Sequence, residues 1–402
     1  MSELSYLEKL LDGVEVEWVT LGSMADIGTG SSNRQDESEN GIYPFYVRSK
    51  NILKSDTFEF DEVAIVIPGE GGIGDIFHYV EGKYALHQRA YRIRITTNAV
   101  DTKFLYYFMS SSFKQYILTK SVGATAISIR KPMLEGFKVP IPSPDNPEKS
   151  LAIQSEIVRI LDTFTALTAE LTAELTAELN MRKKQYNYYR DQLLSFKEGE
   201  VEWKALGEVA KIQRGASPRP IVNYLTEQGN GIPWIKIGDT IPGSKYIDKT
   251  LQKITAEGAQ KSRILNPGDF VISNSMSFGR PYILRITGAI HDGWASISNF
   301  GEKLNADYLY HYLSSKKVKN YWESKINSGS VSNLNADIIK TLPVPLPDKQ
   351  KQERISALLD KFDTLTNSIT EGLPREIELR QKQYEYYRDL LFSFPKPETV
   401  SN

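Results

Sequence analysis

Two stretches of the chain carry apolar residues at alternating steps of three and four. In 151–196 these positions are Ile153, Ile157, Ile160, Phe164, Leu167 and Leu171. Further along, the same spacing returns at Ile355, Leu358, Phe362, Leu365 and Ile369. Such heptad-like spacing places apolar side chains on one face of a helix, and charges flank both stretches. The pattern predicts two long helices that pack against each other as an antiparallel pair.

Three identical four-residue units, Thr-Ala-Glu-Leu, occupy residues 168–179 of the first predicted helix, beginning at Thr168. Each unit adds about 6 Å of helix rise. Steps of four overshoot the helical period, so the stripe of Leu171, Leu175 and Leu179 drifts and locally unwinds a supercoil. Two interpretations stay open: a spacer of defined length, or a repeat that is tolerated because its residues form helices well. In the matching stretch of the second helix, Gly372 and Pro374 predict a kink or break.

The chain is a tandem duplication. Residues 13–22 (GVEVEWVTLG) return as 199–207 (GEVEWKALG), and the tryptophans Trp18 and Trp203 are 185 positions apart. A second block, 182–196, recurs as 380–394 with an offset of 198, and Leu161-Asp162 recurs as Leu359-Asp360 at the same offset. The predicted helices of the two halves therefore have equal lengths.

Between these blocks lie two segments, 20–150 and 205–347, that differ widely in sequence but share a sparse skeleton. His87 matches His291, and the aromatic run 104–111 matches 308–315, both at an offset of 204. One fold with two different surfaces is the simplest interpretation. Two copies related by a pseudo-twofold suit a partner that is itself nearly twofold symmetric, and DNA is the commonest such partner.

Composition supports a globular protein of 402 residues, with 40% hydrophobic and 11% aromatic residues, long enough for two or three cores. There is no cysteine and there are four histidines, so disulfides are excluded and a Cys/His metal site is nearly so. Neither a signal sequence nor a long uncharged apolar stretch is present, which favours the cytoplasm.

The net charge of −1 conceals two mildly basic regions. Residues 84–144 hold nine Lys/Arg against two acids, and 206–345 hold 17 Lys/Arg against 11 acids. Phosphate neutralisation is the main sequence-independent source of DNA affinity. Charge alone leaves ordinary solvated surface equally open.

The Thr-Ala-Glu-Leu units, the block Lys-Gln-Tyr-Asn-Tyr-Tyr-Arg-Asp at 184–191 and the stretch Ile-Pro-Trp-Ile-Lys-Ile-Gly-Asp at 232–239 resemble the specificity subunits of type I restriction-modification enzymes, IC subgroup. The resemblance covers essentially the whole chain. It implies two target-recognition domains, each binding one half of a split DNA site, with helices that fix the spacer between the halves. It also implies two modification (methyltransferase) subunits docked on the helices and restriction subunits that join them, with S-adenosylmethionine, ATP and magnesium on those partners and no cofactor or metal on this chain.

The expected fold class is α+β, with two recognition domains of mixed strands and short helices in pseudo-twofold tandem repeat, separated by the helices. The expected boundaries are an N-terminal segment 1–19, a first recognition domain 20–150, a central helix and linker 151–204, a second recognition domain 205–347 and a C-terminal helix 348–402.

Candidate DNA contacts are polar and basic residues beside predicted turns, which can address phosphates or base edges. For any one of them ordinary surface chemistry is the commoner explanation. His87 and His291 are equally compatible with DNA contacts and with buried hydrogen bonds. In the first lobe the candidates are Ser31, Ser32, Asn33, Arg34, Arg48, Lys50, Asn51, His87, Arg89 and Arg92. In the second they are Arg214, Ser217, Arg219, Lys236, Asn274, Ser275, Arg280, His291 and Trp294.

No motif for catalysis stands out. Residues 69–74 fit G-x-G-x-x-G, but a strand-like stretch follows and no acid stands about 20 residues on, so a glycine turn beside DNA is the better interpretation. Phosphate-loop, methyltransferase and nuclease signatures are missing from the sequence, so catalysis is expected from partners. Two alternatives remain: a coiled-coil scaffold whose lobes bind proteins or glycans, and an enzyme that acts alone.

Overall fold

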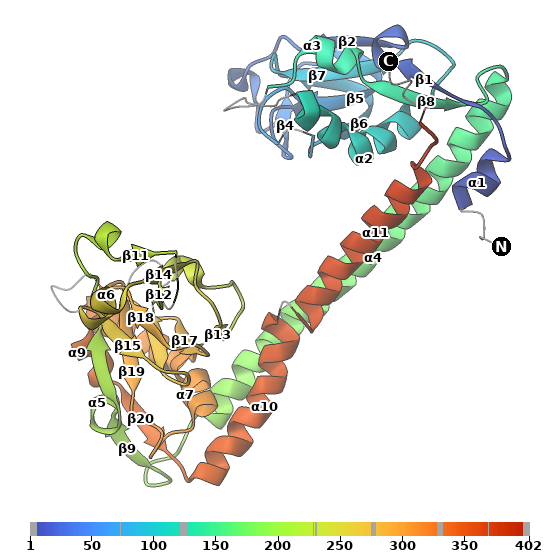
Figure 1. Cartoon of the computed structure of the whole chain (residues 1–402). Helices are drawn as coiled ribbons and strands as arrows, with labels where there is room; N and C mark the ends of the chain where they lie inside the picture. The colour runs from blue at the N-terminus through green and yellow to red at the C-terminus, as the bar shows by residue number, and fades with distance from the viewer. Residues whose placement is uncertain are drawn as a thin grey trace. The chain divides into compact units, whose positions relative to one another are not determined.

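The computed structural model describes residues 6–72, 74–120, 128–227, 229, 231–274, 279–327, 333–368 and 370–396. The chain divides into two compact units (Figure 1). Unit 1 comprises Met1–Leu171 with Arg380–Asn402, and unit 2 comprises Thr172–Leu379. Each unit therefore combines a lobe of strands and helices with parts of the long helices.

The lobe of unit 1 is built on a six-stranded sheet in the order β2-β7-β5-β6-β3-β4. Its strands are β2 (Ala25–Thr29), β3 (Tyr43–Tyr46), β4 (Ile52–Ser55), β5 (Phe60–Pro68), β6 (His78–Leu86) and β7 (Ala90–Ile95). All neighbours are antiparallel except β3 and β6. Helix α2 (Thr102–Lys120) packs on the sheet, burying Phe104, Phe108 and Phe113 in the main core. Smaller elements complete the lobe: α1 (Tyr6–Leu11), β1 (Val16–Thr20), α3 (Lys131–Glu135) and β8 (Lys138–Pro142), with β1 paired to β8.

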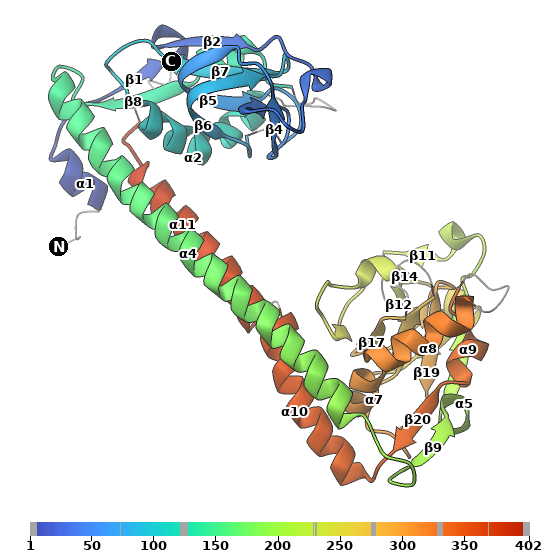
Figure 2. The same ribbon diagram turned by 180° about the vertical axis from the view of Figure 1, so that it is seen from behind.

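The lobe of unit 2 has two five-stranded sheets, β10-β19-β16-β17-β13 and β11-β14-β12-β18-β15. The strands are β10 (Lys211–Arg214), β11 (Leu225–Thr226), β12 (Ile232–Ile235), β13 (Tyr246–Ile247), β14 (Gln252–Ile254), β15 (Arg263–Leu265), β16 (Phe270–Ser273), β17 (Pro281–Leu284), β18 (Gly288–Ile290) and β19 (Trp294–Ser298). The helices are α5 (Leu206–Val209), α6 (Ala256–Gln260), α7 (Ala306–Leu313), α8 (Lys316–Asn327) and α9 (Ala336–Lys340), and β9 (Glu202–Ala205) pairs with β20 (Pro343–Leu346). Figure 2 shows α8 and α9 lying against the strands of this unit.

The two lobes repeat one topology. The run β2-β7-β5 of unit 1 corresponds in order and direction to β10-β19-β16 of unit 2. The long strand β6 is replaced by the successive strands β17 and β18. In each lobe an earlier strand runs parallel to that element, since Tyr46 is in register with Leu86 and Ile235 with Ile290. The predicted α+β tandem repeat is confirmed.

The long helices are α4 (Pro147–Leu193, 47 residues), α10 (Lys349–Asn367) and α11 (Leu373–Leu391). The predicted break is confirmed, because α10 ends five residues before Gly372, which has a φ of +84°. A Cβ at Gly372 would lie 2.5 Å from the carbonyl oxygen of Thr364, so only glycine fits this turn. Pro374 then occupies the first turn of α11, where its missing N–H costs nothing.

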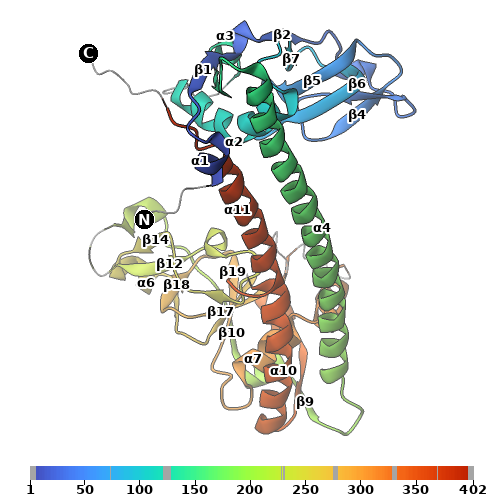
Figure 3. The ribbon, with the colours of Figure 1, turned by 90° about the vertical axis from the view of Figure 1, so that its right-hand side faces the viewer.

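Within each unit α4 pairs with the other long helix. In unit 1, α4 and α11 run along each other (Figure 3). Phe164 and Tyr387 are 5.9 Å apart between ring centroids, and the Thr165 and Tyr384 hydroxyls are 3.0 Å apart. In unit 2, Tyr189 stacks on Phe362 at 5.5 Å. The pairing in unit 1 is antiparallel, as predicted.

The regular apolar seam, in contrast, is only partly observed. Ile153 and Ile157 are buried in the lobe core of unit 1, and Ile355 belongs to the lobe core of unit 2. Leu167 and Leu358 are 58% and 42% exposed. The apolar positions therefore serve lobe packing as much as helix pairing, and Ile369 lies outside the described residues. The leucines of the repeated units, Leu171, Leu175 and Leu179, are half-buried.

A polar network joins lobe to helix in unit 2. His311 of α7 is fully buried, with Nδ1 2.8 Å from the Tyr186 hydroxyl and Nε2 2.8 Å from Asp360 Oδ1. The ammonium of Lys245, only 7% exposed, lies 2.7 Å from that same oxygen and 2.5 Å from Asp307.

Unit 1 repeats this network in a simpler form. Asp162, the counterpart of Asp360, accepts hydrogen bonds from the Tyr107 hydroxyl at 2.6 Å and from Lys103 at 2.7 Å. Tyr107 stands where His311 stands in the second half, at the offset of 204. The same aspartate thus anchors both lobes to their helices.

Candidate nucleic-acid interface

In the first lobe, three separate candidate segments meet around one hollow of 320 Å³. It is lined by Arg34, Val47, Arg48, Ser49, Leu53, Glu70, Gly71 and His87. Glu70 comes from the glycine turn between β5 and β6, and its carboxylate lies 3.2 Å from both Arg48 and Arg89. Those hydrogen bonds and charges, first from Arg89 and then from Arg48, hold the pKa of the Glu70 carboxyl below its usual value. Both arginines remain about half exposed, so Glu70 of the glycine turn holds two cationic side chains at the edge of the hollow.

The segment that follows β2 is held in place by hydrogen bonds with neighbouring residues, while its arginine side chain is exposed. The Glu59 carboxylate accepts hydrogen bonds from the backbone N–H groups of Ser31 and Ser32, at 2.8 and 3.1 Å. The Asn33 side chain accepts a hydrogen bond from Gln88. The Arg34 side chain is 86% exposed, with a loose contact of 3.9 Å to Glu37. A fixed backbone therefore presents an exposed guanidinium to solvent.

In the second lobe, five candidate residues converge on Asp292. Its carboxylate contacts the Ser217 hydroxyl at 2.9 Å, His291 Nε2 at 3.0 Å and Arg219 at 3.4 Å. Its backbone carbonyl oxygen accepts hydrogen bonds from Asn274 at 3.2 Å and, more weakly, from Arg214 at 3.5 Å. Burial alone would raise the pKa of Asp292, but the hydrogen bond from Ser217 and the charge of His291 leave it lowered. Asp292 is thus an anionic centre around which polar and basic loops are arranged.

The two clusters contain the same short motif. Gly30-Ser-Ser32-Asn-Arg34 matches Gly215-Ala-Ser217-Pro-Arg219 at the offset of 185 that also separates the tryptophans. Each glycine packs directly against the histidine loop of its lobe: an added Cβ would lie 1.8 Å from the Leu86 carbonyl oxygen at Gly30, and 2.1 Å from that of His291 at Gly215. Arg219 is 83% exposed, close to the 86% of Arg34. The duplication therefore preserved a loop that ends in an exposed arginine.

The matched histidines also share a role. His87 Nδ1 accepts a hydrogen bond from the backbone N–H of Arg89 at 3.0 Å, and His291 Nδ1 accepts one from Gly293 at 2.9 Å. His87 is 7% exposed and stacks on Phe45, and burial lowers its pKa. His87 is thus a buried structural hydrogen-bonder, whereas the side chain of His291 is 41% exposed.

Three candidates are placed away from these surfaces. Trp294 is fully buried and its indole N–H donates to the Ile235 carbonyl oxygen at 3.2 Å, so it is a core residue and the expectation of a DNA contact is wrong. Arg92 is 14% exposed between Asp26 at 2.7 Å and Glu62 at 3.1 Å, which makes it a structural ion pair across the sheet. Arg280 lines a different cavity, beside the long helices.

The remaining candidates divide simply. Lys50 and Asn51 are exposed next to Arg48. Lys236 follows β12 and donates to the Gln252 side chain at 2.8 Å. Ser275 lies outside the described residues. The organising acids Glu59, Glu70 and Asp292 were missed, although Asp292 could have been suspected from its place between His291 and a glycine.

The described residues contain no cluster of His, Cys, Asp and Glu side chains suited to a metal ion. Within that same part of the chain, no helix is both long and apolar enough to cross a bilayer.

Comparison with known proteins gives a consistent answer. The family model described as "Type I restriction modification DNA specificity domain" matches residues 13–181 and 198–379. The Escherichia coli type I restriction enzyme EcoR124I/EcoR124II specificity subunit is 41% identical over the full length of both chains. The E. coli EcoprrI specificity subunit is 36% identical over 92% of this chain and 93% of its own. A solved chain from a study of complex assembly and conformational transition in the type I restriction-modification system matches with a TM-score of 0.64 at 17% identity, covering 94% of this chain and 97% of that one.

The double match and the duplicated lobes define a two-domain DNA-specificity protein. The chain belongs to the specificity subunits of type I restriction-modification systems, as the sequence motifs predicted. Proteins of this class select the DNA and leave catalysis to other subunits, so the chain is not itself the enzyme.

Proposed function

We propose that each lobe reads one half of a two-part DNA site, and that the loop ending in Arg34 or Arg219 is the reader common to both lobes. The matched Gly-x-Ser-x-Arg motif carries this proposal, because it survives between lobes whose surfaces otherwise diverge. A fixed loop with an exposed guanidinium suits bidentate contact with a guanine edge or a phosphate. The neighbouring residues Arg48, Arg89 and Arg214 would supply phosphate contacts.

The lobes, taken as residues 20–150 and 205–347, act as independent readers in this proposal. Lys50, Asn51, Asn274 and His291 extend the surface on either side of the motif. The acids Glu70 and Asp292 hold the basic loops in place while their charge is partly offset by the arginines they contact. A half-site would thus be recognised by loops whose shape is set before DNA arrives.

The long helices set the unread gap and carry two modification subunits. Exposed tyrosines support docking of one kind of partner twice: Tyr188 and Tyr189 of α4 are 61% and 41% exposed, and their repeats Tyr386 and Tyr387 of α11 are 64% and 41% exposed. Tyr189 and Tyr387 also pack on Phe362 and Phe164. Tyr188 and Tyr386 are the more exposed pair and stay identical in the duplicated block, and aromatic residues are enriched at interfaces, so this pair supports docking. Restriction subunits complete the complex, which works in the cytoplasm, with S-adenosylmethionine, ATP and magnesium bound by the partners.

The test is binding of the complex of this chain with its modification partner to duplex DNA at increasing salt. We expect affinity to fall linearly in a log–log plot, as it does when phosphate contacts release counterions. Mapping of the methylated bases in cells carrying both subunits would then give two short half-sites separated by a fixed gap. Affinity that is independent of salt, or methylation at a single undivided site, would contradict the proposal.

A further inference from the structure

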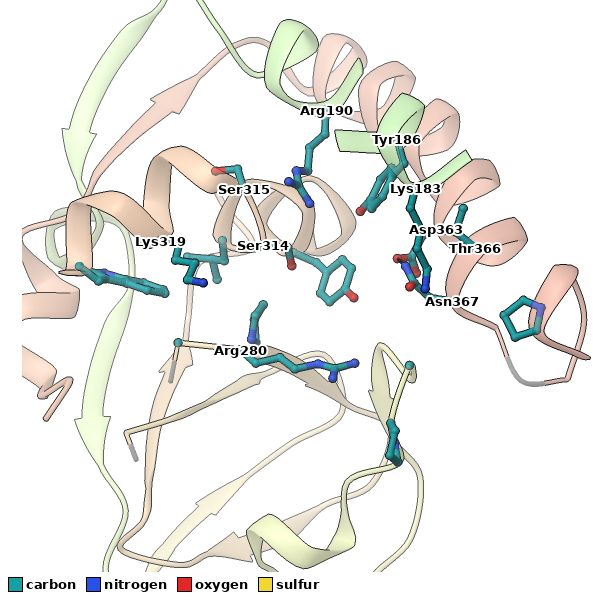
Figure 4. A pocket seen from close by; sticks show the side chains of 18 residues that line it. Lys183, Tyr186, Arg190, Arg280, Ser314, Ser315, Lys319, Asp363, Thr366 and Asn367 are labelled. Carbon is teal, nitrogen blue, oxygen red and sulfur yellow. Dashed lines mark hydrogen bonds between the residues drawn. The ribbon is translucent and has the colours of Figure 1, made fainter. Parts of the chain in front are cut away.

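Unit 2 contains a cavity of 540 Å³ apart from the DNA-facing loops (Figure 4). Its walls come from α4, α7, α8 and α10 and from the turns at 242–243 and 279–281. Four cationic side chains line it: Lys183 and Arg190 of α4, Arg280 before β17, and Lys319 of α8. The hydroxyls of Ser314 and Ser315 lie on the same wall.

Two donors in this wall are buried without a hydrogen-bond acceptor among the described residues. Arg190 is 7% exposed, and its Nε has no hydrogen-bond partner because the nearest carboxylate, that of Asp191, is 3.7 Å away. Trp322 is 1% exposed, and its indole N–H is likewise unpaired. Buried donors of this kind cost free energy unless an acceptor reaches them.

The cations of the cavity are also poorly compensated by acids. Within the described chain no ion pair holds Lys183 or Arg280, and Lys319 has only Glu323 at 3.8 Å on the exposed face of its own helix. Asp363 is the one carboxylate in the lining. Burial raises the pKa of Asp363, and its oxygen already accepts a hydrogen bond from Asn367 at 2.9 Å. The cavity is therefore an electropositive recess.

Comparison of the two halves shows that the lysines of the cavity occur in the second half alone. At the offset of 198, Arg190 and Tyr186 are repeated as Arg388 and Tyr384, but Lys183 becomes Gln381. At the offset of 204, the paired serines are repeated at 110–111, but Lys319 becomes Gln115. A partner docked identically on both halves would need both sets of lysines. The ligand of this cavity is therefore one that meets only the second half.

We propose that this recess is an anion site that takes a phosphate group, held by Lys183, Arg190, Arg280 and Lys319 with help from the serine hydroxyls. Guanidinium groups, ammonium groups and hydroxyls together form the donor set that proteins use for phosphate. The volume exceeds what a single carboxylate would need and falls in the range of small-ligand sites. Its source is either the DNA backbone beside one half-site, which rests on the proposed function, or a free phosphate compound.

The experiment uses the chain in complex with its modification partner and compares the triple variant Lys183→Gln, Arg280→Gln, Lys319→Gln with a control. The control triple variant, Lys184→Gln, Lys316→Gln, Lys249→Gln, removes the same charge from exposed residues that do not line the cavity. Arg190 is left intact because it is buried. Thermal unfolding of both variants checks that neither has lost the fold.

Titration with pyrophosphate in the absence of DNA is the first readout. We expect wild type and control to bind it in the millimolar range or tighter, and the cavity variant to lose at least tenfold in affinity. DNA binding at increasing salt is the second readout. If the cavity binds a phosphate of the DNA backbone, the slope of log affinity against log salt should be smaller in the cavity variant than in wild type by about one or more. If the cavity variant loses pyrophosphate binding but keeps the slope, the natural ligand of the cavity is a free phosphate compound.

The proposal is overturned if wild type binds no pyrophosphate and the cavity variant keeps the slope of the control. That result leaves the proposed function standing as long as wild type binds its split site with salt dependence. Loss of salt-dependent DNA binding in wild type would instead refute the proposed function.

Discussion

The two lobes share a scaffold and differ in almost everything they expose. The run β2-β7-β5 and its counterpart β10-β19-β16 have the same order, and β14 pairs with β12 as β4 pairs with β3. The long strand β6, however, becomes two short strands in the second lobe, and β11 and β13 have no equivalents in the first. What both lobes keep is the loop glycine, the serine two residues later and the exposed arginine. The difference teaches that the buried strand order fixes the position of the loops that carry Arg34 and Arg219, while the rest of the loop sequence can differ.

A second contrast lies at the joints with the helices. Lys245 is buried and contacts two partly exposed carboxylates, whereas Lys103 is 36% exposed and forms an ion pair with Asp162. The second lobe is therefore fixed to its helix by a partly dehydrated charge network, and the first by a pair that water can screen. These contrasts can be tested by experiment, beginning with the largest expected effect.

Replacing residues 20–150 with the lobe of another specificity subunit is expected to change one half-site completely and leave the other untouched. The lobes have separate cores, so each should fold and bind independently. Methylation mapping in cells provides the readout. A change in both half-sites would show that the lobes do not read independently.

Deleting residues 172–175, one Thr-Ala-Glu-Leu unit, is expected to shorten the gap by about one base pair. The deletion removes about 6 Å of helix, which cannot be absorbed freely against about 3.4 Å per base pair. Both half-sites should stay the same. Altered half-sites with an unaltered gap would show that the helix does not set the spacing.

Lys245→Ala is expected to destabilise the protein by about 2 kcal/mol, because it removes a buried ammonium and leaves two partly exposed carboxylates without their partner. The matched change Lys103→Ala should cost less than about 1 kcal/mol, as for exposed pairs. Denaturant unfolding gives both values. Equal losses in the two variants would contradict the contrast between the joints.

Acid should weaken the contacts of Asp360 with Lys245 and His311. Burial raises the pKa of Asp360, but hydrogen bonds from His311 and Lys245 outweigh it and leave that pKa lowered. A lowered folded-state pKa adds stability above the unfolded value of about 3.9. That stability is lost as the pH falls further, so the deficit of Lys245→Ala should shrink below about pH 4.

Arg34→Gln and Arg219→Gln are each expected to weaken binding by about 1–3 kcal/mol and to relax one position of one half-site. Each variant serves as the other's control, and Lys138→Gln and Lys249→Gln match the charge loss at exposed sites outside the clusters. Competition binding with single-base variants of the site gives the readout. A uniform loss across all sequences would assign these arginines to phosphates instead of bases.

The sequence predicted the architecture well because duplication makes it visible. Equal offsets fixed the helix lengths, and Gly372 with Pro374 marked the break between α10 and α11. Local candidates were less secure. Trp294 and Arg92 were chosen by residue type, but a tryptophan in a strand core and an arginine flanked by acids from other strands cannot be recognised without the sheet register. Glu70 was missed for the same reason, since its arginines come from two distant segments.

The smallest expected effect concerns Asp363, whose counterpart in the first half is the uncharged Thr165. Burial raises the pKa of Asp363, so the folded state disfavours its charged form, and stability falls as the pH rises from about 3.9 to the folded-state value. Asp363→Asn keeps the shape and can still accept the hydrogen bond from Asn367. We expect a gain of up to about 1 kcal/mol at pH 7 that disappears below about pH 4. A gain that persists in acid would assign the effect to packing, and a loss at pH 7 would mean that the charge supports Lys245 and His311.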